Sequence, residues 1–165
     1  MHAIVAIDMA RGIGKHGDLL TRISADLKRF KSLTLGKTNI YGRKTLETFP
    51  GGKVLPGRKN WILSRQLENG SIEGAEIFNS EDKLLERIEK AKSEGETDFI
   101  VIGGASIYEL LLPYCDECWI TRIRANFGAD AFFPDLKTKG FELSDCGEWQ
   151  KEGLLHFRYE LWKRN

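Results

Sequence analysis

DFIVIGGASIY, residues 98–108, carries the signal that decides the fold class. Its first half, residues 98–102, is apolar after Asp98 and has the length of a strand, which is typical of a buried strand in a parallel sheet. Two glycines follow, and the next residues begin a helix. Junctions of this kind place ligands at the carboxyl ends of strands, where bare helix N–H groups suit an anion. The stretch therefore predicts an α/β protein with a ligand site at this sheet edge.

Strands and helices alternate through the first two thirds of the chain. We expect strands over residues 3–7, 38–41, 60–63, 76–78 and 98–102. A loop punctuated by Gly12, Gly14 and Gly17 precedes the first helix, which we expect over residues 25–33 with Ser24 as its N-cap. Further helices are expected after Gly42, between residues 80 and 95, and from residue 105 to about residue 112.

After residue 112 the pattern changes. Residues 117–123, 141–146 and 156–162 are typical of strands, and no helical pattern lies between them. The chain therefore predicts a single domain over residues 1–165, built as a three-layer α/β sandwich. Its mixed, mostly parallel central sheet has about eight strands and an antiparallel C-terminal edge.

The composition excludes several classes of protein. Hydrophobic residues make up 41% and charged residues 30% of the 165 residues, which is enough for a core and argues against disorder. Lys+Arg 25 and Asp+Glu 24 leave a net charge of +1, so nucleic-acid and membrane-surface partners are not expected. The N-terminus lacks a signal-peptide pattern, and no apolar run reaches the roughly 20 residues of a membrane helix.

Cysteine usage favours the reducing cytoplasm. Three cysteines are an odd number and too few for a disulfide scaffold. Cys115 and Cys118 form one CxxC pair, but a structural zinc site usually needs a second pair. We therefore expect no metal.

Two strand–glycine–helix junctions are candidate phosphate sites. Tyr41–Thr45 joins a strand to a glycine and then to two cations and a hydroxyl, and Ile102–Ser106 contains the two glycines described above. Either junction alone is also an ordinary corner of an α/β protein. Together with Ser64–Arg65 at the end of a third strand, they favour an adenine dinucleotide with an extra phosphate. Neither GxGxxG nor GxxxxGK[ST] is present, which argues against an ordinary Rossmann or P-loop site.

Asp26 is the strongest candidate for chemistry. At helical spacing it lies within an apolar stripe formed by Ile23, Leu27, Phe30 and Leu33. The alternative is a first-turn acid that favours the helix dipole. A carboxyl group in apolar company has a raised pKa, and it can bind an amidine-like heterocycle or help to deliver a proton.

Arg58 is a candidate for binding a substrate carboxylate. It ends the turn Leu55-Pro56-Gly57-Arg58, from which its guanidinium could make a bidentate pair. The alternative is a solvated turn arginine.

Taken in order, these segments resemble the dihydrofolate reductase family over nearly the whole chain. The matching stretches are residues 4–7, 12–14, 24–27, 29–31, 41–45, 55–60, 62–65, 101–105, 107–108, 121–123 and 130–134. The resemblance implies reduction of 7,8-dihydrofolate to tetrahydrofolate, a step of one-carbon metabolism, with a hydride passing from NADPH to C6 of the pterin. It also implies a monomer and a cis peptide between Gly103 and Gly104.

Residue roles follow from the same resemblance. Asp26 matches the active-site acid that holds the pterin and promotes protonation at N5, and Thr121 matches the threonine that supports it. Matches to substrate-binding positions are Ile4, Ala6, Leu27, Phe30, Phe49, Leu55 and Arg58. Matches to NADPH-binding positions are Ala6, Ile13, Gly14, Leu19, Gly42, Arg43, Lys44, Thr45, Leu63, Ser64, Arg65, Ile102, Gly103, Gly104, Ala105, Ser106, Ile107 and Tyr108.

The chain departs from the family pattern in its glycine-rich loop. Gly17, Leu20 and Thr21 stand where the family usually carries asparagine, proline and tryptophan, and Ala131 replaces a frequent threonine. The tryptophan normally contacts the pterin, so we expect a wetter site. Two rival functions are a pyrimidine reductase of riboflavin synthesis, which shares the fold and NADPH, and a non-catalytic NADPH-binding module.

Overall fold

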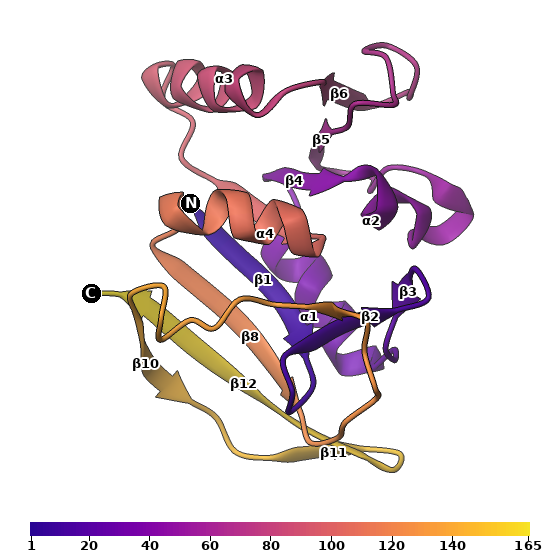
Figure 1. Cartoon of the computed structure of the whole chain (residues 1–165), viewed down its shortest axis with the longest axis vertical. Helices are drawn as coiled ribbons and strands as arrows, with labels where there is room; N and C mark the ends of the chain where they lie inside the picture. Colours follow the sequence, from indigo (N-terminus) through magenta and orange to yellow (C-terminus); the bar gives the residue numbers. More distant parts are fainter.

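A computed structural model describes residues 1–165 (Figure 1). The strands are β1 (His2–Ile7), β2 (Gly12–Lys15), β3 (Asp18–Leu19), β4 (Thr38–Gly42), β5 (Lys59–Leu63), β6 (Ala75–Phe78), β7 (Phe99–Gly103), β8 (Glu117–Ile123), β9 (Ala131–Phe132), β10 (Phe141–Cys146), β11 (Gln150–Glu152) and β12 (Leu155–Arg164). The α-helices are α1 (Ser24–Thr34), α2 (Arg43–Glu47), α3 (Glu81–Ser93) and α4 (Ala105–Leu111), and short 3₁₀ turns cover Pro50–Gly52 and Leu112–Tyr114.

The central sheet has the mixed, mostly parallel order that the sequence predicts. Eight strands run in the order β10-β12-β8-β1-β7-β4-β5-β6, and β11 pairs with β12 as a ninth. From β8 to β6 every neighbouring pair is parallel. The antiparallel edge arises because β12 runs against β8, β10 and β11. The predicted fold class is therefore confirmed.

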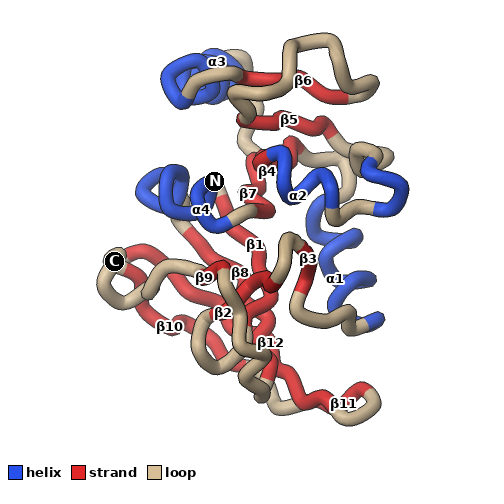
Figure 2. The backbone as a smooth tube through the Cα atoms, turned by 45° about the vertical axis from the view of Figure 1, so that its right-hand side comes forward, coloured by secondary structure: helices blue, strands red, loops and turns tan.

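Helices cover both faces of the sheet because successive strand residues point to opposite sides. On β1, Ala3, Val5 and Ile7 belong to the larger apolar cluster, to which α3 and α4 also contribute. Ile4 belongs instead to the cluster formed with α1 and α2. Figure 2 shows α3 and α4 on one side of the sheet and α1 and α2 on the other. The result is the predicted three-layer sandwich.

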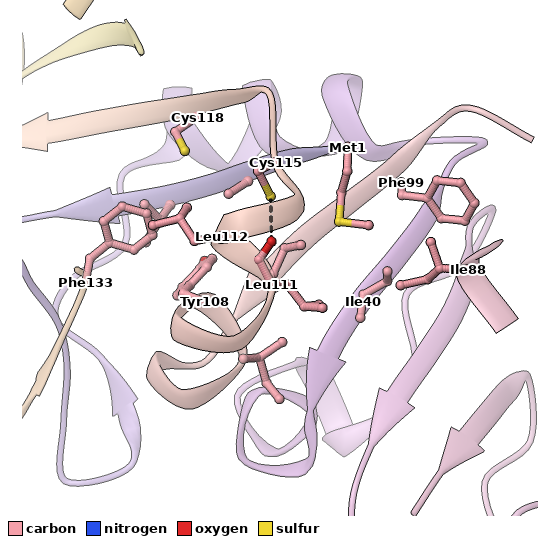
Figure 3. Packing of buried hydrophobic residues seen from close by; sticks show 14 of the residues in the cluster. Met1, Ile40, Ile88, Phe99, Tyr108, Leu111, Leu112, Cys115, Cys118 and Phe133 are labelled. Atoms are coloured by element: carbon pink, nitrogen blue, oxygen red, sulfur yellow. Dashed lines mark hydrogen bonds between the residues drawn. The ribbon is translucent and has the colours of Figure 1, made fainter. Parts of the chain in front are cut away.

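The larger cluster also takes up the CxxC pair (Figure 3). Cys115 and Cys118 are both fully buried and unpaired, and Cys115 Sγ donates to the carbonyl oxygen of Leu111 at 3.4 Å. Burial raises the pKa of the Cys115 thiol to about 12. These thiols pack as small apolar groups within the cluster.

The glycine-punctuated loop is more regular than predicted. Residues 12–19 form a small hairpin of β2 and β3, and β2 also pairs with β9. Gly17, at φ +76°, lies in the turn of this hairpin, where a residue with a side chain is disfavoured. The prediction of a loop was wrong because the stabilising partner, β9, lies more than a hundred residues away in the sequence.

The N-cap predicted for α1 was also wrong. Ser24 is the first residue of the helix, and Ile23 occupies the cap position without any side-chain hydrogen bond. By contrast, the helix expected between residues 80 and 95 has a local cap, because Ser80 Oγ accepts from the backbone N–H of Lys83 at 3.3 Å. No helix in the structure combines the length and apolar character that a membrane span requires.

Candidate active site

A short hydrogen bond joins the first helix to the central sheet. Thr121, buried on β8, donates from Oγ1 to Oδ1 of Asp26 in the first turn of α1, at 2.5 Å. Burial raises the pKa of Asp26, and this effect outweighs the hydrogen bond from Thr121 and the charge of Arg29, which both lower it. Asp26 therefore keeps its proton to a higher pH than an exposed aspartate does.

Apolar side chains from β1, α1 and the segment after α2 form a cluster on the sheet face that carries Thr121. Ile4 is buried, and Phe30, Phe49 and Leu55 are half-buried members of the same cluster. Ala6 lies on the same face of β1 as Ile4 and pairs with Thr121 across the strands. The structure thus brings the predicted pterin-side residues to one side of the sheet.

Leu27 differs from its predicted environment. The sequence places it in the apolar stripe of α1, but its side chain is 45% exposed, whereas Ile23 is only 3% exposed. Ile23, Phe30 and Leu33 are the stripe residues that pack against the rest of the molecule, so Leu27 stays at the surface. The stripe is therefore only partly buried.

Asn60 builds the turn that carries Arg58. Its Nδ2 donates to the carbonyl oxygens of Leu55 at 3.0 Å and Arg58 at 3.1 Å. Its Oδ1 accepts from the Leu55 N–H at 3.2 Å and from the Tyr41 hydroxyl at 2.8 Å. Sequence reasoning missed this role, although an asparagine three residues after a proline–glycine pair is a usable signal.

Arg58 itself has hydrogen-bonding capacity to spare. Its Nε is buried and has no hydrogen-bond partner, and burial lowers its pKa. A buried donor without an acceptor is costly, so an incoming carboxylate would satisfy it.

The two candidate phosphate junctions meet at the carboxyl ends of the strands. Gly42 of β4 lies level with Leu63 of β5, and Tyr41 lies level with Gly103 of β7. Gly103 has φ +131°, and a Cβ built on it would come within 3.1 Å of Thr45 Oγ1. The predicted cis peptide between Gly103 and Gly104 is present. Glycines at these positions keep the two junctions close and their backbones open to a ligand.

The cations and hydroxyls near these junctions differ in their availability. Lys44, Ser106 and Arg65 are exposed, and Arg65 makes no ion pair. Arg43 pairs with Glu47 one turn along α2. Ser64 is buried, and its Oγ accepts from the N–H groups of Gln66 at 3.1 Å and Leu67 at 3.3 Å.

Two predicted cofactor residues on α4 are mostly buried. Tyr108 is 2% exposed, and its hydroxyl donates to the carbonyl oxygen of Ile4 at 2.7 Å. Its ring packs edge-on against Phe133, and Figure 3 shows it within the larger cluster. Ile107 is also buried, while Ala105 and Gly104 are half-buried. Tyr108 thereby ties α4 to the strand that carries Ile4 and Ala6.

Two carboxylates hold the hairpin that carries Ile13, Gly14 and Leu19. Asp8 is fully buried; its Oδ1 accepts from Gly12 N–H at 2.7 Å, and its Oδ2 accepts from Phe127 N–H at 3.1 Å. Asp130 Oδ2 accepts from His16 N–H at 3.0 Å. Sequence reasoning assigned neither residue a role, and no spacing pattern identifies distant backbone partners such as Phe127 for Asp8 or His16 for Asp130.

Comparison with known proteins places this geometry in a family. A profile of the dihydrofolate reductase family matches residues 1–164. The chain belongs to the dihydrofolate reductase family. It is 37% identical to the dihydrofolate reductase of Staphylococcus haemolyticus over 131 residues, covering 79% of this chain and 74% of the relative. It is 32% identical to that of Bacillus subtilis over 158 residues, covering 96% of this chain and 89% of the relative.

A solved dihydrofolate reductase has the same architecture. The enzyme from Enterococcus faecalis, complexed with NADP(H) and RAB-propyl, superposes with a TM-score of 0.83 at 31% identity, covering 99% of this chain and 95% of that chain. Family membership confirms the predicted reaction, NADPH-dependent reduction of dihydrofolate, and the predicted cofactor. The family model that matches the chain is dihydrofolate reductase and not the rival pyrimidine reductase.

Proposed function

We propose that Asp26 and Thr121 carry the reduction of 7,8-dihydrofolate to tetrahydrofolate in this dihydrofolate reductase. The observation that supports this most directly is the 2.5 Å hydrogen bond from Thr121 to Asp26, whose pKa is raised by burial. Asp26 holds the 2-amino group and N3 of the pterin and promotes protonation at N5. Thr121 fixes the orientation of the acid, because its hydroxyl donates a hydrogen bond to Oδ1, one of the two carboxyl oxygens of Asp26.

The apolar residues around this pair form the pterin pocket. Ile4 and Ala6 supply the sheet side, while Leu27 and Phe30 supply the helix side. The exposure of Leu27 is consistent with a side chain that faces a ligand. Phe49 and Leu55 extend the pocket toward Arg58, whose unpartnered Nε binds the glutamate tail of the substrate.

The residues at the strand ends fit NADPH. A Cβ atom on Gly103 would crowd Thr45 Oγ1, so glycine keeps the backbone bare at this position. A bare backbone is what a phosphate needs in order to approach closely. Lys44, Thr45, Gly104, Ala105, Ser106 and Ile107 lie along the phosphates, while Arg43, Ser64 and Arg65 hold the 2′-phosphate. Ile13, Gly14 and Leu19 lie beside the nicotinamide, and Gly42, Leu63 and Ile102 complete the cofactor site. NADPH, when bound, supplies the hydride that reaches C6 of the pterin.

The experiment follows NADPH oxidation at 340 nm with dihydrofolate across pH, for the wild type and Asp26→Asn. At neutral pH the substitution should lower turnover by roughly 10²–10⁴-fold, the usual contribution of a positioned acid. The rate of the variant should recover at low pH, where the substrate arrives already protonated.

A matched control is Asp82→Asn, which changes an exposed first-turn acid on α3. It should leave the pH profile unchanged. Turnover of Asp26→Asn equal to wild type at neutral pH would contradict the role of the acid. A wild type that binds NADPH but transfers no hydride would instead favour the non-catalytic module.

We also propose that the chain works as a monomer in the reducing cytoplasm, without nucleic-acid partners. The balanced charge and the three unpaired cysteines support this. Light scattering behind size exclusion should give a mass near 18.8 kDa. A dimer mass at micromolar concentration would contradict the monomer.

A further inference from the structure

The N-terminus of α1 is capped from a distant part of the chain. Glu152, at the end of β11, accepts from the backbone N–H of Ser24 through Oε2 at 2.7 Å. Its Oε1 accepts from the N–H of Ala25 at 3.1 Å. These bonds span 128 and 127 residues of sequence. One carboxylate thus meets two of the free N–H groups that begin every helix.

This distant cap replaces a local one. Ile23 holds the N-cap position with φ −109° and ψ 117°, and its apolar side chain cannot accept a hydrogen bond. The negative charge of Glu152 also faces the positive end of the helix dipole, and hydrogen bonds to an ionised acceptor are the stronger kind. Glu152 is half-buried, so water screens these bonds only in part.

The contact closes a ring of interactions around Asp26. Ala25, which Glu152 holds, is the residue before Asp26, and Asp26 is held in turn by Thr121. Thr121 pairs with Tyr159 of β12. The β11–β12 hairpin then returns to Glu152, which pairs with Leu155. Figure 2 shows this hairpin and the start of α1 at the same end of the molecule.

We propose that Glu152 is a positioning residue for the active-site acid: it fixes the first turn of α1 so that Asp26 meets Thr121 and the pterin in one geometry. This rests on the role proposed above for Asp26. Without Glu152 the first turn loses both acceptors, and the helix start frays while the fold remains.

The test compares Glu152→Ala and Glu152→Gln with Lys151→Ala, an exposed neighbour on the same strand. In Glu152→Ala, amide hydrogen exchange at Ser24 and Ala25 should become at least about tenfold faster. The kcat with dihydrofolate should fall about fivefold, because Asp26 spends less time in the productive geometry, while the Kd for NADPH stays within about twofold. Glu152→Gln keeps one amide oxygen as an acceptor, so its exchange rates and kcat should lie between those of wild type and Glu152→Ala. Lys151→Ala should match wild type in both measurements.

A second background isolates the cap. Ser24→Pro removes one of the two N–H groups, and the extended backbone of Ile23 accepts a following proline at the first helical position. We compare the change in log kcat that Glu152→Ala causes in the two backgrounds. In Ser24→Pro this change should be at most about half of the change in wild type. An equal loss in both backgrounds would overturn the proposal.

Two further results would also overturn it: amide exchange within twofold of wild type in Glu152→Ala, or faster exchange with unchanged kcat. The exchange measurement does not depend on turnover. A wild type that fails to reduce dihydrofolate would therefore count against the proposed function alone. In that case, titration of the Asp26 carboxyl by NMR would test whether Glu152 positions Asp26. That titration should shift more in Glu152→Ala than in Glu152→Gln, with Arg29 and Tyr159 as the other titratable neighbours; equal shifts would overturn the proposal.

Discussion

Asp26 illustrates how position, more than residue type, makes a functional group. Burial raises its pKa, and Thr121 and Arg29 compensate only in part. Arg29 in turn stacks on the ring of Tyr159 at 4.1 Å, so its charge is held near the acid by packing rather than by an ion pair. The carboxyl group is thereby oriented while its charged form remains disfavoured, which suits an acid that must promote a proton transfer.

Thr21 stands where the family resemblance implies a tryptophan. A threonine lacks the broad flat surface that the usual tryptophan gives the pterin. Thr21→Trp should lower the KM for dihydrofolate about threefold to tenfold, since an aromatic contact contributes about 0.5–1.5 kcal/mol. Steady-state kinetics measure this, with Thr21→Leu as a control that is apolar but not planar. A KM that does not change in Thr21→Trp would show that the missing wall does not limit binding.

Arg65 should decide the choice between NADPH and NADH. It is exposed and makes no ion pair, whereas Arg43 is already paired with Glu47. Arg65→Ala should raise the KM for NADPH about tenfold or more, because a hydrogen bond to a charged group contributes about 1.5–3 kcal/mol. The KM for NADH serves as the control and should change little. Equal changes for the two cofactors would place the 2′-phosphate elsewhere.

At the scale of elements, β8 and β12 share a buried ionic network. Glu160 of β12 has a side chain that is 1% exposed, and it accepts hydrogen bonds from Arg122, Arg158 and Trp162. Burial alone would raise the pKa of Glu160, but these hydrogen bonds and the charge of Arg122 bring it below its usual 4.5. Arg122 and Arg158 therefore share Glu160 as their counter-charge, at the place where the antiparallel edge joins the parallel sheet.

Glu160→Gln should lower the free energy of unfolding at pH 7 by about 3–5 kcal/mol, because it leaves two arginines without their counter-charge. Because the folded pKa of Glu160 is lowered, its contribution is present above the unfolded pKa of 4.5 and is lost as pH falls through the folded pKa. Urea unfolding at several pH values measures this difference, which should shrink in acid. Glu142→Gln, on the exposed β10, is the control. Equal urea midpoints at pH 7 would contradict the prediction.

At the scale of the whole molecule, the proposed ligands join two groups of elements. The proposed cofactor residues lie largely at the ends of β4, β5 and β7, while the acid and its partner come from α1 and β8 (Figure 1). Helices and strands from both groups pack on one continuous sheet. A ligand that touches both groups should therefore stabilise the entire fold.

NADPH at about 100 times its Kd should stabilise the protein by about 2.7 kcal/mol, which corresponds to a rise in Tm of roughly 5–10 °C. Differential scanning fluorimetry measures the shift, and NADH at the same concentration is the control. We expect a smaller shift with NADH because it lacks the 2′-phosphate. An unchanged Tm with NADPH would contradict the cofactor site proposed here.

Several features of this protein could be predicted from its sequence because their signals are local. The apolar run 98–102, the two glycines after it and the cap at Ser80 each act through neighbours within a few residues. The order of matching segments then indicated the family, and with it the pairing of Asp26 with Thr121, which the structure shows at 2.5 Å. Periodicity alone placed Asp26 in the stripe but did not supply its partner.

The tertiary structure decided the features whose partners are distant in sequence. Ser24 has the residue type of an N-cap, yet Glu152 supplies the cap, because the β11–β12 hairpin brings a carboxylate to the helix start. The Gly12–Lys15 segment forms a strand because β9 pairs with it, and Leu27 stays exposed because other residues of its stripe make the contacts. Local sequence determines which conformation a segment favours, whereas the burial of a side chain and the partner of an unpaired N–H depend on what the rest of the chain places beside it.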